Sequence, residues 1–136
     1  MLGLLLMSSL AYAGPEASIR SRAHAFELKG DWSGAQTEYA KLEKIEGFRG
    51  EALYGEAFAT FQLNDMASTT ELARRASEQP GRFAERARLL YGDALFRSRE
   101  FAHAKDIYFS LHETATGDQR AMLERKLIAC DRGRSK

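Results

Sequence analysis

The stretch that decides the fold is residues 90–111, LYGDALFRSREFAHAKDIYFSL. Its second half, residues 99–111 (REFAHAKDIYFSL), follows the same pattern as residues 30–42 (GDWSGAQTEYAKL) and residues 64–76 (NDMASTTELARRA). In each copy a large apolar residue follows a two-residue turn, and small or apolar residues mostly recur three, seven and ten positions later. The copies begin 34 and 35 residues apart. This period is typical of helical solenoids, in which each unit buries its apolar face against its neighbours.

The rest of the chain also favours helices, because Ala, Leu, Glu, Arg and Lys dominate and alternating strand patterns are missing. We expect helices over about residues 16–29, from 33 onward, around 53–61, and over 67–78, 83–98, 101–114 and 119–131. Gly117 is expected to take the left-handed conformation that ends a helix, and Asp118 to cap the next one. The predicted fold class is all-α: a solenoid of three helical hairpins with a C-terminal capping helix. This domain spans residues 14–131, and a basic tail follows at residues 132–136.

The first 13 residues, MLGLLLMSSLAYA, form an apolar run that ends in an Ala-x-Ala pattern. This pattern predicts a signal peptide that is cleaved after Ala13, and hence a periplasmic or secreted protein. The run is too short to span a bilayer, which needs about 20 residues. No Lys or Arg precedes it, so either the true start lies upstream or the signal is a weak one. The alternative to a signal peptide is a first solenoid helix with an apolar start.

Composition narrows the classes of partner. The net charge of +1 argues against a dedicated nucleic-acid binder. Residues 14–81 carry a net charge of −3 and residues 82–136 carry +4. This split either favours head-to-tail contacts and the steering of a charged partner, or reflects scattered solvated charges. Cys130, the only cysteine, is expected to be a buried small hydrophobe, with a bond between two chains as the alternative.

No pattern in the sequence indicates catalysis or metal binding. His103 and His112 are nine residues apart on one expected helix, too far apart for a shared metal ion, and His24 lies on another helix. Nucleotide-binding, hydrolase and zinc-protease motifs are missing from the sequence. We therefore predict that the protein is not an enzyme and uses no cofactor or metal.

The three copies resemble tetratricopeptide repeats, which are helix–turn–helix units of about 34 residues. The best match is LYGDALF at residues 90–96 with the apolar positions that follow it, and the second copy departs most from the pattern. Gly92 stands where the family needs a small residue between the two helices, as do Ala57 and Ala23. The resemblance implies packing roles for the large residues Trp32, Tyr39, Phe101 and Tyr108.

The resemblance also implies a concave groove that is lined by the first helix of each hairpin and takes a peptide. Its expected residues are Arg20, His24 and Glu27 from the first unit, Glu51, Tyr54, Phe58 and Phe61 from the second, and Arg86, Leu89, Asp93, Phe96 and Arg97 from the third. An aromatic strip flanked by arginines suits an apolar segment with acidic neighbours. Phe61 and Phe96 have a second interpretation as packing between repeats.

Members of the family that bind chaperone tails hold a C-terminal carboxylate with an Asn- and Lys-rich groove. His24, Phe58 and Asp93 stand where an Asn would be expected, which argues against such a clamp. The sequence instead predicts a scaffold or adaptor in a bacterial cell-envelope or secreted assembly, with an unidentified protein partner. The alternatives are a structural subunit that self-assembles end to end, and a non-catalytic accessory subunit of an enzyme complex.

Overall fold

The computed structural model describes residues 14–136, which form seven α-helices. The helices are α1 Pro15–Leu28, α2 Trp32–Leu42, α3 Arg49–Gln62, α4 Met66–Ser77, α5 Ala84–Arg97, α6 Phe101–His112 and α7 Gly117–Arg134. Most of their ends lie within about two residues of the expected ones. The expected signal peptide, residues 1–13, lies outside the described residues.

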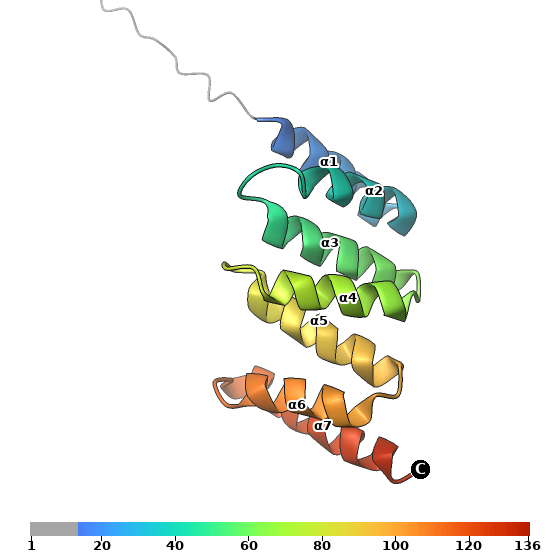
Figure 1. Cartoon of the computed structure of the whole chain (residues 1–136), viewed down its shortest axis with the longest axis vertical. Helices are drawn as coiled ribbons and strands as arrows, with labels where there is room; N and C mark the ends of the chain where they lie inside the picture. The colour runs from blue at the N-terminus through green and yellow to red at the C-terminus, as the bar shows by residue number, and fades with distance from the viewer. Residues whose placement is uncertain (1–13) are drawn as a thin grey trace, which may run out of the picture.

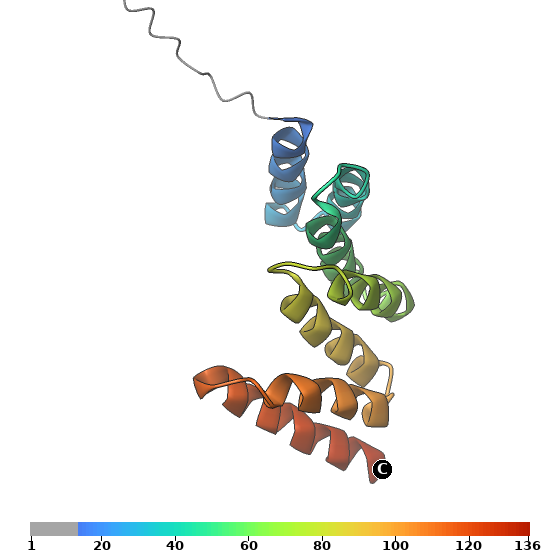
Figure 2. The ribbon, with the colours of Figure 1, turned by 60° about the vertical axis from the view of Figure 1, so that its left-hand side comes forward.

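The helices form a single stack of hairpins (Figure 1). Each helix packs on the next one in the chain, and α3 also contacts α5. Figure 2 shows that the helix direction changes along the stack, from the steep α1 to the nearly horizontal α6. This arrangement confirms the predicted all-α solenoid of three hairpins followed by a final helix. Within the described residues, none of the helices combines the length and apolar character that a membrane crossing requires.

The turn inside each hairpin has the same backbone geometry in all three copies. Its first residue is left-handed, with φ of +70° at Gly30, +60° at Asn64 and +65° at Arg99. The amide of the next residue then donates to the carbonyl five positions earlier, at 2.9 Å in every copy. The side chains of Asp31 and Asp65 accept from the amide three residues ahead, whereas Glu100 makes no such bond. The repeated turn therefore satisfies helix-end groups that would otherwise lack partners.

The Gly30→Ala variant is expected to lose about 1 kcal/mol of unfolding free energy, because an L-residue pays a steric cost at φ +70°. No atom within 4 Å would meet the added methyl group, so the backbone conformation alone carries the effect. Urea denaturation, monitored by circular dichroism, measures this change in unfolding free energy. The matching variant Asn64→Gly should change stability in the opposite direction, and equal shifts of the same sign would contradict this interpretation.

The second hairpin, which matched the repeat pattern least well, is nevertheless complete. Its small positions Ala57 and Ala73 are fully buried. Thr60 and Thr69 face each other in the same interface, with their hydroxyl oxygens 2.9 Å apart. Each hydroxyl also lies within 3 Å of a carbonyl oxygen one turn earlier in the chain. The polar residues therefore fit the core because their hydroxyl groups are hydrogen-bonded.

The last helix is longer than the sequence predicted. It continues to Arg134, so the expected basic tail is largely helical. Gly117 is left-handed, as expected, but begins α7, and Asp118 lies in the first turn rather than capping it. Cys130 is fully buried in the core, which supports its interpretation as a small hydrophobe.

Candidate functional site

Most of the expected groove residues line hollows on the surface of the stack. On α3, the side chains of Tyr54, Phe58 and Phe61 follow one another at helical spacing and line two separate hollows. On α5, Asp93, Phe96 and Arg97 line the second of these hollows. Because one stripe of α3 borders both, the two hollows belong to a common groove.

The first hollow, which we call the N-terminal hollow, has a volume of about 250 Å³. It is lined by Glu27, Tyr39, Glu51, Tyr54, Gly55, Phe58 and Phe83. The ring of Tyr54 stacks against Phe58 at 6.4 Å and lies 5.6 Å from Phe83. Trp32 packs edge-on against Phe58 at 5.7 Å. These half-buried rings form a preorganised apolar surface that a partner side chain can cover.

Charged groups of the N-terminal hollow already have partners in the chain. Nε of Arg20 donates to Oε1 of Glu51 at 2.7 Å. The hydroxyl of Tyr39 donates to Oε1 of Glu27 at 2.9 Å, and burial together with this carboxylate raises the pKa of Tyr39. His24 is exposed, and its Nδ1 lies 3.5 Å from Oε2 of Glu27. Two of the expected groove charges, Arg20 and Glu51, therefore neutralise each other, which leaves the aromatic rings as the main contact surface.

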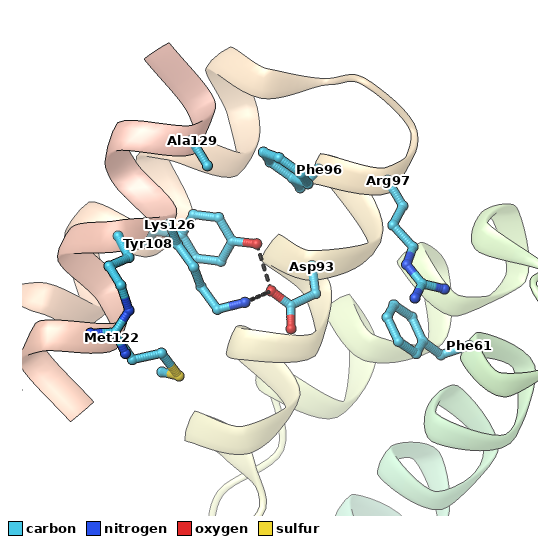
Figure 3. A pocket seen from close by; sticks show the side chains of 9 residues that line it. Phe61, Asp93, Phe96, Arg97, Tyr108, Met122, Lys126 and Ala129 are labelled. Carbon is cyan, nitrogen blue, oxygen red and sulfur yellow. Dashed lines mark hydrogen bonds and ion pairs between the residues drawn. The ribbon is translucent and has the colours of Figure 1, made fainter. Parts of the chain in front are cut away.

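The second hollow, the C-terminal hollow, has a volume of about 520 Å³ and lies between α3, α5, α6 and α7 (Figure 3). Its lining residues are Phe61, Asp93, Phe96, Arg97, Tyr108, Met122, Arg125, Lys126 and Ala129. Phe61 and Phe96 pack against the core and also line the hollow. The guanidinium of Arg97 lies over the ring of Phe61 at 4.3 Å.

Asp93 is held by two donors at the centre of the C-terminal hollow. The hydroxyl of Tyr108 and Nζ of Lys126 reach the same oxygen, Oδ1, at 2.6 and 2.7 Å (Figure 3). Lys126 also lies 5.4 Å above the ring of Tyr108. Burial and the bond to Asp93 raise the pKa of Tyr108, so its hydroxyl stays a donor at neutral pH. The network fixes α5, α6 and α7 relative to one another across the groove.

Two of the expected groove residues, both on α5, line neither of these hollows. Arg86 and Leu89 line a depression of about 60 Å³ with side chains of α7. Arg86 is exposed, and Leu89 is half-buried. The expected groove residues are therefore not gathered in a single cavity but spread over the two hollows, this depression and the exposed surface beside them.

The sequence interpretation missed the contribution of α7, which it treated only as a cap. Met122, Arg125, Lys126 and Ala129 line the C-terminal hollow from this helix. Their spacing of three, four and seven residues places them on one face, next to the buried stripe of Leu123 and Cys130. The sequence did contain an indication of this role, because Met122 and Ala129 extend the apolar face of α7 beyond its buried stripe.

The groove holds no recognisable catalytic arrangement. Among residues 14–136, no three His, Cys, Asp or Glu side chains are placed to hold a metal ion. The carboxylate of Asp93 is occupied by a tyrosine and a lysine, and Cys130 is buried with a raised thiol pKa. What the site offers chemically is half-buried aromatic rings and exposed guanidinium groups.

Comparisons with known proteins identify the fold. No family model matches the chain, and no curated protein matches its sequence. A solved structure described as the TPR2B-domain:pHsp70-complex of yeast Sti1 superposes with a TM-score of 0.76 at 17% identity. The match covers 86% of this chain and 96% of that one. The chain therefore has the fold of a tetratricopeptide-repeat domain.

Proposed function

We propose that the protein is a protein–protein interaction module that binds a peptide segment of its partner in the groove. The observation that carries this proposal is the aromatic stripe of Tyr54, Phe58 and Phe61, which lines two hollows. Half-buried aromatic side chains in a preformed depression are the usual anchors of protein interfaces. The similarity to a domain solved in a complex adds support through the fold.

The groove of this chain favours an apolar anchor over a terminal carboxylate. Phe58, at one of the positions where a carboxylate clamp would use an amide, stacks on Tyr54 and meets Trp32 edge-on. Asp93, at another, is a carboxylate held by Tyr108 and Lys126, so it offers no donor to an anionic end. The ligand is therefore expected to insert an apolar side chain beside Tyr54 and Phe58.

Site-specific crosslinking tests this proposal. A photoreactive phenylalanine analogue at position 58 should crosslink to one contiguous segment of a partner, identified by mass spectrometry of the crosslinked peptide. The same analogue at position 109 is the matched control, because Phe109 is exposed and lines neither hollow. Replacing Tyr54 with Ala should lower the crosslinking yield from position 58 by about tenfold. Crosslinks from position 109 alone would place the partner elsewhere and contradict the proposal.

We also propose that the module acts as a scaffold or adaptor outside the cytoplasm, in a bacterial envelope or secreted assembly. The support is the apolar, uncharged segment at residues 1–13 with its Ala-x-Ala end. Sequencing the N-terminus of the protein purified from its native host tests this: cleavage predicts Gly14 as the first residue. A mature chain that still begins at Met1 would contradict export by cleavage.

The charge split favours a second candidate function, self-assembly of the solenoid end to end. Residues 14–81 are net negative and residues 82–136 net positive, so opposite ends of two copies attract each other. In that case the mass measured by light scattering rises with protein concentration and falls in high salt. A monomer mass that is independent of both would contradict self-assembly.

A further inference from the structure

A third and larger hollow lies at the C-terminal edge of the stack, beside the C-terminal hollow, with which it shares Phe96, Arg97, Arg125 and Ala129. It has a volume of about 710 Å³ and forms where α5 ends, α6 begins and α7 ends. We call it the C-terminal basic pocket; its lining residues are Phe96, Arg97, Arg99, Phe101, Arg125, Ile128, Ala129, Arg132, Gly133 and Lys136. Half of these residues are cations and none is acidic. Five of the twelve Lys and Arg residues of residues 82–136 thus lie on one surface.

These cations have no carboxylate partners among residues 14–136. Arg97, Arg125 and Arg132 are exposed and take part in no ion pair within that range. The neighbouring acidic group on α7, Asp131, is instead bound to Nζ of Lys105 on α6 at 2.7 Å. Uncompensated positive charges that line one pocket repel one another, and a ligand carrying negative charge relieves the repulsion.

The floor of the pocket is apolar. The rings of Phe96 and Phe101 pack edge to face at 5.2 Å, and Ile128 at their side is 52% exposed. Gly133 allows the last turn of α7 to lie directly on Phe101, since a Cβ at that position would come within 2.7 Å of the ring. This contact, with the bond between Lys105 and Asp131, holds Arg132 beside the floor. The pocket is therefore a built surface rather than a loose basic tail.

We propose that the C-terminal basic pocket binds an acidic peptide segment that carries a large apolar side chain. The arginines attract the carboxylates and hydrogen-bond to them, and the exposed Ile128 with Phe96 and Phe101 receives the apolar side chain. A peptide fits this surface better than a single-stranded nucleic acid. The floor rings pack against each other, so they do not form the open stacking platform that bases need. This surface extends beyond the groove, because Ile128 and Arg132 line it and line neither of the two groove hollows.

Fluorescence anisotropy with a defined probe tests this inference. The probe is a labelled peptide with a central Leu-Phe pair between two runs of alternating Glu and Asp. Binding to the full chain should weaken about tenfold or more when NaCl rises from about 50 to about 500 mM. It should also weaken about tenfold for each of Arg125→Glu and Arg132→Glu. Arg88→Glu is the matched control, because Arg88 is an exposed arginine of α5 that lines none of the three hollows, and it should bind like the original chain.

Three results would overturn the inference. The first is no binding of the probe by the original chain, and the second is equal binding of a single-stranded oligonucleotide of the same charge. The third is unchanged binding in the two α7 variants. Loss of probe binding in Tyr54→Ala with no loss in Arg132→Glu would assign the peptide to the groove, so the two proposals fail separately. Replacing the Leu-Phe pair of the probe with Ala-Ala should weaken binding about tenfold, and an unchanged affinity would contradict the apolar part of the proposal.

Discussion

The Gly92→Ala variant is expected to lower the unfolding free energy by about 2 kcal/mol, although alanine is the better helix former. A Cβ at position 92 would lie 2.7 Å from Cε1 of Tyr108, well inside contact distance. The ring of Tyr108 has no room to retreat, because it is 1% exposed and its hydroxyl is held by Asp93. The helices α5 and α6 must therefore separate, and the C-terminal hollow changes with them.

Urea denaturation of the purified chain measures this effect, and Gly50→Ala is its control. Gly50 lies in the first turn of α3, where an added Cβ would meet the Cβ of Gln79 at 3.3 Å. Its gain in helix propensity offsets that mild contact, so the change should stay below about 1 kcal/mol. Equal changes in the stability of Gly92→Ala and Gly50→Ala would contradict this explanation, because they would show that the close approach to Tyr108 is not the reason for a glycine at position 92.

The repeat pattern predicted the hairpins because it reports on local constraints. A left-handed residue is needed at Gly30, Asn64 and Arg99, and small residues are needed where paired helices approach. Both requirements fall at fixed positions in each copy and are therefore visible in the sequence. The family resemblance implied a small residue at Gly92, and its contact with Tyr108 supplies the physical cause.

The groove was less predictable because its character depends on pairs that are distant in sequence. Arg20 and Glu51 are 31 residues apart, and nothing in the local pattern indicates that they neutralise each other. Lys126 reaches Asp93 over 33 residues, from a helix outside the repeated motif. Long side chains choose among many rotamers, so these pairings follow from the assembled fold rather than from helical periodicity. The apolar stripe of α3 could be predicted, whereas the charge balance around it could not.

The Glu56→Gln variant is expected to be more stable than the original chain at pH 8 by up to about 3 kcal/mol. Glu56 lies on α3, is 8% exposed, and its Oε1 has no hydrogen-bond partner among residues 14–136. Burial, followed by the carboxylate of Glu43, raises the pKa of Glu56 to about 7. Arg75, the cation that would offset this effect, is hydrogen-bonded to Glu43 at 2.9 Å. Ionising Glu56 therefore places an uncompensated charge inside the stack.

The sign of the pH dependence follows from this raised pKa. Between about pH 4.5 and pH 7 the folded chain binds a proton at Glu56 that the unfolded chain releases, so stability falls as pH rises. Above pH 7 both states are ionised at this residue, and its contribution stays constant. Unfolding free energies measured from pH 4.5 to 8.5 should therefore decline more steeply for the original chain than for Glu56→Gln. The exposed Glu46 provides the control, since Glu46→Gln should leave the slope unchanged. Parallel curves for the original chain and Glu56→Gln would mean that Glu43 and Arg75 rearrange to solvate the charge.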